Sequence, residues 1–154
     1  MGSGEIACNA ANMAEQQRKT RRANELGETG RYVARNVARI RSAQGLSTMR
    51  LATMLAGAGR SISATAITRV ESGERRVDVD DLVALAAALN VNPSALLLPP
   101  TADGEVDVTG AGAVLAEEAW AWMDGERPLL DADDENIALG FQLHARPPGR
   151  RSIA

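Results

Sequence analysis

The sequence predicts an all-α protein, with one domain of five helices followed by a short helical C-terminal extension. Apolar residues make up 45% of the 154 residues, but aromatic residues only 3%. A core must therefore be built from alanine, valine, leucine and isoleucine, which suits close helix packing better than a sandwich of strands. Residues 30–98 also carry dense apolar patterning at helical spacing.

The chain divides into three parts. Residues 1–28 show little hydrophobic periodicity and are expected to form a mobile segment, with Met13 to Leu26 as its one candidate helix. Residues 29–100 form the helical domain, which the Pro99-Pro100 pair closes. Residues 101–154 form an acidic extension, for which we expect a role in dimerisation or contact with a partner.

Each helix of the domain has an apolar stripe and a signal that starts or stops it. In chain order, the stripes are Val33, Val37 and Ile40; Leu51, Ala52 and Leu55; Ile67 and Val70; Leu82, Leu85, Ala86 and Leu89; and Leu96 and Leu97. The stop signals of the first three helices are Gly45, then Gly57 with Gly59, then Gly73. The N-caps of the last four are Ser47, then Ser61 or Ser63, then Asp78, then Asn92 before Pro93.

Two helices are expected in the extension. The first runs from Ala113 to Met123, with Leu115, Ala119 and Trp122 on one face. Trp120 lies off this stripe, so the two indoles are not expected to bury against the same surface; Trp120 and Trp122 are also candidates for a dimer or partner contact. The second helix contains Ile137, Leu139, Phe141 and Leu143, which alternate as in a strand. Acids before them and a basic residue with prolines after them favour a helix.

Charge is distributed unevenly. From Arg31 to Arg76, nine arginines face only Glu71 and Glu74, a local balance of +7, whereas residues 77–154 carry −10. The net charge of −3 conceals this asymmetry. A basic module joined to an acidic extension indicates a polyanionic partner for the module, although an ordinary charged surface would look the same.

Several classes of function are disfavoured. The single cysteine, Cys8, cannot form an internal disulfide, and no Cys and His cluster has metal-ligand spacing, so neither a metal nor another cofactor is expected. The only histidine, His144, lies beside prolines, and Glu117 and Glu118 are adjacent, so they point to different helix faces. Self-cleavage by a Ser-Lys dyad is disfavoured because the only lysine is Lys19. We therefore expect a non-enzymatic protein of the cytoplasm and nucleoid, without a membrane partner.

Four segments resemble the lambda-repressor-like helix-turn-helix family, the Cro/repressor or xenobiotic-response-element type. They are IRSAQGLS at 40–47, LATML at 51–55, ITRVESG at 67–73 and DDLVALAAALNVNPSALL at 80–97. In that family the second helix crosses the DNA backbone and the third lies in the major groove. The resemblance covers about 65 residues.

The resemblance also implies roles for individual residues. Arg41 and Glu71 match an ion pair that ties the first helix to the recognition helix. Thr48 matches a phosphate contact at the start of the second helix. The loop after the recognition helix would contact phosphates through Arg75 and Arg76. The recognition helix itself would contact bases and the DNA backbone through Ser63, Ala64, Thr65, Thr68 and Arg69. Only Arg69 among these has a fork that reaches both acceptors of a guanine, although Thr65 and Thr68 could simply be solvent-facing.

One feature departs from the family pattern. The segment AGAGRSISATA, residues 56–66, is about five residues longer than the compact form. Either Arg60 on this loop adds a phosphate contact, or the second and third helices meet at an altered angle.

Together, these features predict a regulator that binds double-stranded DNA, as a repressor and a homodimer on two half-sites. Two alternatives remain open. One is an antitoxin that represses its own operon and binds a toxin through the extension. The other is an adaptor that keeps the fold but binds only protein.

Overall fold

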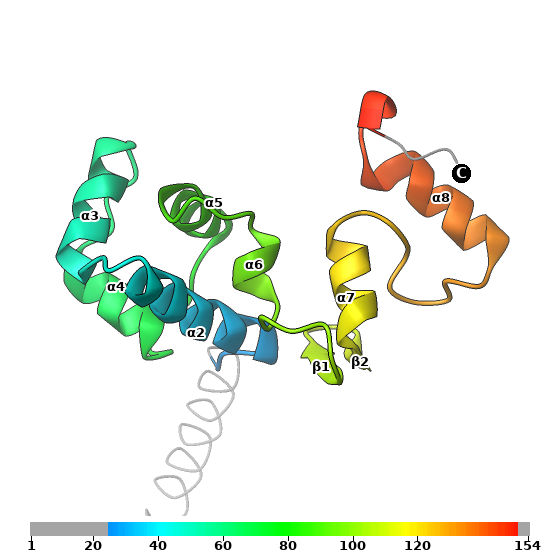
Figure 1. Ribbon diagram of the computed structural model, residues 1–154, viewed down its shortest axis with the longest axis horizontal. Coiled ribbons are helices and arrows are strands. Elements are labelled where there is room, and N and C mark those ends of the chain that lie inside the picture. The colour runs from blue at the N-terminus through cyan, green and yellow to red at the C-terminus, as the bar shows by residue number, and fades with distance from the viewer. Residues whose placement is uncertain (1–24, 151–154) are drawn as a thin grey trace, which may run out of the picture.

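The computed structural model describes residues 25–150, and the expectations for residues 1–24, including most of the candidate helix from Met13, lie outside this range. Five helices form the first unit: α2 (Glu28–Ala43), α3 (Thr48–Gly57), α4 (Ala64–Glu71), α5 (Val79–Ala88) and α6 (Ser94–Leu97). The predicted five-helix domain is thus confirmed. Figure 1 shows α3 and α4 at one end of the molecule and α8 at the other.

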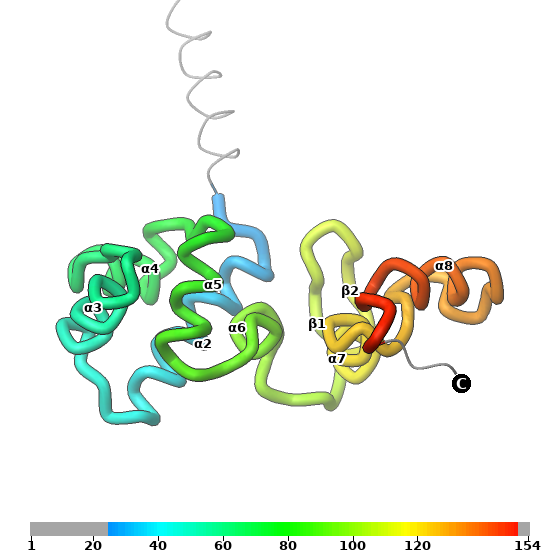
Figure 2. Tube along the Cα trace, turned by 90° about the horizontal axis from the view of Figure 1, so that it is seen from above, coloured from blue at the N-terminus to red at the C-terminus, as the bar shows by residue number. Residues whose placement is uncertain are grey.

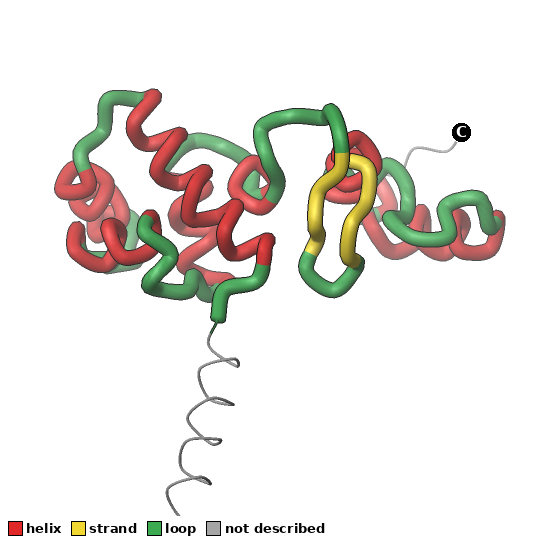
Figure 3. The backbone as a smooth tube through the Cα atoms, turned by 90° about the horizontal axis from the view of Figure 1, so that it is seen from below, coloured by secondary structure: helices red, strands yellow, loops and turns green. Residues whose placement is uncertain are grey.

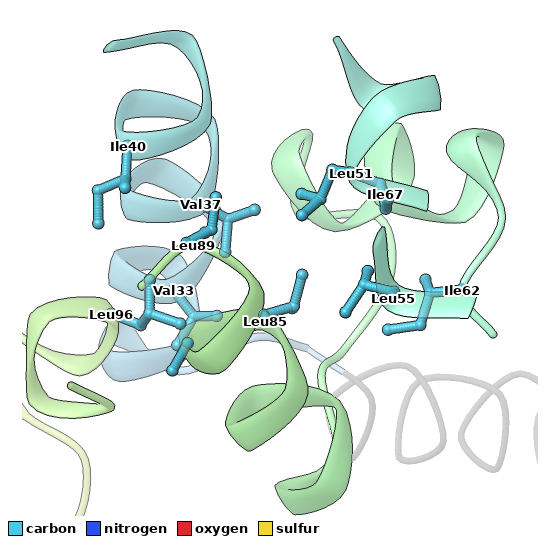
Figure 4. Packing of buried hydrophobic residues seen from close by; sticks show 11 residues of the cluster. Val33, Val37, Ile40, Leu51, Leu55, Ile62, Ile67, Leu85, Leu89 and Leu96 are labelled. Carbon is cyan, nitrogen blue, oxygen red and sulfur yellow. The ribbon is translucent and has the colours of Figure 1, made fainter. Parts of the chain in front are cut away.

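The core of this unit is aliphatic, as the composition indicates. Val37, Leu51, Leu55 and Leu89 are fully buried. They belong to a cluster to which α2, α3, α4, α5 and α6 all contribute (Figure 4). Every helix therefore buries its apolar stripe against the others, and this packing fixes the position of α4.

Three of the predicted N-caps act where they were predicted, whereas α6 begins at Ser94 with Pro93, not Asn92, at its N-cap. Ser47, Ser63 and Asp78 each accept a hydrogen bond from a backbone N–H three residues later, and Ser63 rather than Ser61 begins α4. The side chain of Asn92 accepts from the backbone N–H of Ala95 at 3.1 Å. Gly45, two residues after the end of α2, has a φ of 67°. This conformation is unfavourable for residues other than glycine, so Gly45 stops the helix.

The all-α prediction is wrong for the extension. Residues 105–115 form an antiparallel hairpin of β1 (Glu105–Val108) and β2 (Gly112–Leu115). In β1, Val106 and Val108 are buried while the alternate residues are exposed, a period of two that only a strand produces. Gly110 and Gly112 have positive φ values of 92° and 80° in and after the turn. The helix expected from Ala113 therefore begins only at Ala116.

The hairpin, α7 (Ala116–Met123) and the linker build a second apolar cluster on the N-terminal part of α2. Its buried members are Leu98, Val106, Val108, Ala116 and Ala119. Both Trp120 and Trp122 pack against it, contrary to the expectation that they could not share a surface. The cluster can take both indoles because its residues come from α2, the linker, the hairpin, α7 and the following loop, whereas the prediction considered one stripe of a single helix. Figures 1 and 3 show this unit between the five-helix domain and α8.

The last elements are α8 (Glu135–Ala145) and a short 3₁₀ turn, η1 (Pro148–Arg150). The choice of a helix over a strand is confirmed, and Asp134 caps it by accepting from the backbone N–H groups of Asn136 and Ile137. No residue of α8 is buried, and Figure 2 shows it at the far end of the chain from α3 and α4. Across residues 25–150, no helix is both long enough and apolar enough to cross a membrane.

Candidate nucleic-acid interface

Helix α4 presents a polar face to solvent because its apolar residues point into the core. Ile67 and Val70 are only 1% and 3% exposed. Side chains spaced three or four residues apart share a helix face. The outer face of α4 therefore carries short polar side chains and one long, positively charged side chain. This face is formed by Thr65, Thr68 and Arg69, which are all exposed.

The C-terminal end of α4 is held by an ion pair with α2. Arg41 donates from Nε to Oε1 of Glu71 at 2.6 Å and from Nη2 to Oε2 at 2.8 Å. Its Nη1 donates to the carbonyl of Leu46 at 2.7 Å. The side chains are 16% and 12% exposed, and the hydrogen bonds to Glu71 raise the pKa of Arg41 above its usual value. A bidentate pair of this kind fixes the orientation of the two helices.

Both flanks of α4 meet at one buried carboxylate, Asp81 in the first turn of α5. Arg60, in the loop before α4, donates from Nε to Oδ1 of Asp81 at 2.8 Å. Arg75, in the loop after α4, donates from Nη2 to Oδ2 at 3.0 Å. The side chain of Asp81 is 3% exposed, against about 40% for each arginine. We call these three residues the Asp81 clamp; it ties the segments that enter and leave α4 to the same helix.

Two further acids surround Arg60. Its Nη2 lies 3.0 Å from Oδ2 of Asp78, and its Nη1 lies 3.9 Å from Oδ2 of Asp80. The backbone N–H of Asp81 donates to Asp78 at 2.7 Å, and this bond, assisted by the charge of Arg60, lowers the pKa of Asp78. The hydrogen bond to Asp81 raises the pKa of Arg60. The lengthened loop is therefore fixed by charge as well as by Ile62, which is 4% exposed.

Comparison with protein families matches residues 38–96, from the middle of α2 to α6, to the Helix-turn-helix family. This segment is a helix-turn-helix domain. The Cro/repressor-type resemblance of the sequence is thereby confirmed for it, and the match supports a role in DNA-binding transcriptional regulation. Comparison with the curated proteins gives no match, and neither does comparison with the solved structures.

In the helix-turn-helix domain, an open groove of about 780 Å³ separates α3 from the start of α4. The loop contributes Ser61, Ile62 and Ser63 to its wall, and Arg75, in the loop after α4, also lines it. The remaining lining residues come from α3 and α4: Met49, Ala52, Thr53, Ala56, Ala64, Thr65 and Ala66. The extra loop residues thus enlarge the surface of the helix-turn-helix domain beside α4.

The other site residues predicted from the sequence lie on the same domain. Thr48 is the half-buried first residue of α3. Arg69 is 61% exposed, with Nε 3.7 Å from Oε2 of Glu74. Arg76 donates from Nη2 to the carbonyl of Glu25. Arg60 and Arg75 both donate hydrogen bonds to Asp81. Their phosphate contacts stay predictions, and any such contact must form beside the bond to Asp81 or replace it.

Two structural residues were not recognised in the sequence. Asp81 lies four residues before Leu85 and eight before Leu89, on the buried stripe of α5. This spacing could have predicted from the sequence that the carboxylate is buried. Asn36 is 2% exposed. Its Nδ2 donates to the carbonyls of Leu96 and Leu98 at 3.1 and 2.7 Å, which joins α2 to the linker. Within residues 25–150 no group of three or more His, Cys, Asp or Glu could hold a metal ion.

Proposed function

We propose that the helix-turn-helix domain, within residues 29–100, binds double-stranded DNA sequence-specifically and acts as a repressor on two half-sites. The observation that supports this most is the outer face of α4. Its polar side chains are exposed, while the Arg41–Glu71 pair and the Asp81 clamp hold the helix at both ends. A preorganised helix with one long cation is suited to the major groove, where base edges can be distinguished.

Base readout comes from α4. Arg69 forms a bidentate contact with O6 and N7 of a guanine. It can leave its exposed ion pair with Glu74 to do so, because surface ion pairs contribute little to stability. The methyl groups of Thr65 and Thr68 contact thymine, and Ala64 allows close approach of the backbone. Ser63 already serves as the N-cap of α4, so it acts at the DNA backbone instead.

Phosphate contacts surround this face. Thr48 contacts a phosphate at the start of α3, and Arg76 contacts the backbone beyond α4. Arg75 lines the groove between α3 and α4 and reaches a phosphate from there while it keeps its bond to Asp81. Arg60 is the weakest of these candidates because three aspartates already surround it.

Binding requires two copies, because one short helix reads too few base pairs for specificity in a genome. We place the dimer contact in residues 101–154. Trp120 and Trp122 can contribute only in part, since both pack within their own chain and the indole N–H of Trp120 donates to the carbonyls of Pro99 and Thr101.

The test is selection of bound sequences from a random duplex pool at near-physiological salt. Wild type should yield a two-half-site motif, and Arg69→Ala should relax it at one position per half-site, with a loss of about 1–3 kcal/mol. Arg127→Ala is the matched control, since Arg127 is an exposed arginine of the extension. Binding without a motif would leave a phosphate-only binder, and no binding of any duplex would favour the protein-only adaptor.

A further inference from the structure

The loop between α3 and α4, residues 58–63, is anchored to the domain at two points. Arg60 donates from Nε to Oδ1 of Asp81 at 2.8 Å, which ties the loop to α5. Ile62 is 4% exposed and belongs to the aliphatic core, where it lies beside Leu55 of α3 (Figure 4). An ion pair and a buried side chain, two residues apart, therefore define the course of this loop.

The residues on either side of Ile62 face solvent. Ser61 and Ser63 are exposed, whereas Ile62 between them is buried. This alternation is that of an extended chain, in which residues i and i+2 lie on the same side. Ser63 has extended dihedral angles, with a φ of −68° and a ψ of 156°. The two hydroxyl groups therefore lie on the outer side of the loop, and we call Ser61 and Ser63 the serine pair.

The serine pair borders the groove between α3 and the start of α4. Both serines line this groove, and so does Arg75. The guanidinium of Arg75 lies near the loop because it binds the same carboxylate as Arg60. Its Nη2 donates to Oδ2 of Asp81 at 3.0 Å, opposite the bond from Arg60 to Oδ1. The groove thus brings two hydroxyls and one cation together.

These three side chains keep hydrogen-bond donors for a ligand. Ser63 uses its Oγ to accept from the backbone N–H of Ala66 at 3.1 Å, so its O–H remains a donor. Arg75 is 39% exposed and bonds to Asp81 through Nη2, which leaves most of its five N–H groups for other acceptors. Ser61 is exposed and contributes a further O–H. The groove therefore offers at least three donors.

A site made of donors selects an anion. Among residues 25–150, those that line the groove include no Asp or Glu. Serine hydroxyls and arginine are side chains that donate to phosphate oxygens of the DNA backbone. The groove is also lined by Thr65, which belongs to the outer face of α4 that we propose for base readout. A backbone phosphate next to the bases that α4 reads is therefore the anion that fits.

We infer that the serine pair and Arg75 together bind one phosphate of the DNA backbone, in a site that the lengthened loop builds. This inference rests on the proposed binding of DNA by α4 and adds a contact to it. The cation of the loop, Arg60, is instead held by Asp81 and two further aspartates. The loop thus contacts DNA through neutral hydroxyls, which raise the affinity without releasing more counterions.

The first test is titration of a single half-site duplex with the full chain at several KCl concentrations. Ser61→Ala should weaken binding about tenfold, because a hydrogen bond to a charged oxygen is lost. The slope of log K against log salt concentration should not change, because serine carries no charge. A weakened variant with a shallower slope would mean that a cation, and not the hydroxyl, makes the contact.

Thr53→Val is the matched control for Ser61→Ala. Thr53 lines the same groove from α3, but its hydroxyl already donates to the carbonyl of Met49 at 3.0 Å. This variant should therefore bind with wild-type affinity. If Ser61→Ala also binds with wild-type affinity, the inference is overturned.

A carboxylate at the same position tests where the phosphate lies. Ser61→Asp should weaken binding at least about tenfold more than Ser61→Ala, because it places like charges in contact. Ala87→Asp is the control, since Ala87 is an exposed residue that lines a separate groove between α3 and α5. It adds the same charge and should weaken binding less than about threefold, because the charge is distant and screened. Equal losses in the two variants would contradict the site.

Methylphosphonate substitution identifies the phosphate. Each phosphate of the half-site is replaced in turn by a neutral methylphosphonate, and both wild type and Ser61→Ala are titrated. At one position the replacement should weaken wild type several-fold more than it weakens Ser61→Ala, since both changes remove the same contact. If no position shows this coupling, the serine pair does not bind a phosphate.

The outcomes also separate this inference from the proposed function. A selected motif that Arg69→Ala relaxes, without any phosphate coupled to Ser61, would overturn the phosphate site and leave the proposed function intact. A wild type that binds no duplex would refute both.

Discussion

The Asp81 clamp gives the sharpest test of how α4 is held. Asp81→Asn preserves the shape of the side chain but removes its charge. The amide keeps one acceptor, so it can satisfy either Arg60 or Arg75, and it directs an N–H donor at the other guanidinium. A charge-assisted hydrogen bond contributes about 1.5–3 kcal/mol. Because each arginine is about 40% exposed and can be hydrated instead, we expect a loss of about 2 kcal/mol in the free energy of unfolding.

The neighbouring aspartate provides the control. Asp80→Asn makes the same chemical change one residue away, at a side chain that is 83% exposed and 3.9 Å from Arg60. It should cost less than about 0.5 kcal/mol. Urea denaturation followed by circular dichroism at pH 7 measures both variants. If Asp81→Asn lies within about 0.5 kcal/mol of Asp80→Asn, the clamp does not stabilise the fold and our account of α4 positioning fails.

Three further predictions concern the other polar contacts. Glu71→Ala leaves Arg41 half-buried without its bidentate partner and should cost about 3 kcal/mol in urea denaturation, with Glu71→Gln intermediate. Asn36→Ala leaves two buried carbonyls without a donor and should cost about 2 kcal/mol by the same measurement. Asp78 has a pKa lowered from its usual 3.8, so its charge stabilises the fold above that value and ceases to do so as the pH falls through the lowered pKa. The stability difference between wild type and Asp78→Asn should therefore be constant above about pH 5 and shrink as the pH falls below 4; a difference that grows as the pH falls would contradict this.

The helices were predictable because their signals are local. Ser47, Ser63 and Asp78 bond to backbone groups three residues away, so the sequence around each cap contains the whole interaction. The hairpin was missed because its strands have four residues each, and Val114 and Leu115 of β2 were included in the helix that follows. Such a short strand forms through pairing and burial on α2 and α7, which the sequence does not display.

The site was predictable only in part. The face of α4 follows from helical spacing, and the pairing of Arg41 with Glu71 came from the family resemblance. The Asp81 clamp joins residues up to 21 positions apart, and the choice of Asp81 over Asp80 depends on which acid faces the core. That choice could have been read from the register of Leu85 and Leu89, but the partner arginines could not.

The structure also changes the expected strength of the electrostatic attraction to DNA. The local charge of +7 was counted from Arg31 to Arg76 alone. It leaves out acids of the neighbouring segments that lie close to these arginines in the structure. Four of them, Glu28, Asp78, Asp80 and Asp81, contact arginines of this region and lower the balance to +3. Since each phosphate neutralised contributes about −0.9 to the slope of log K against log salt concentration, the slope per half-site should be nearer −3 than −6. Titrations of a single half-site at several KCl concentrations measure it. A slope near −6 would mean that Arg60 and Arg75 exchange Asp81 for phosphates on binding, and that the clamp opens on DNA.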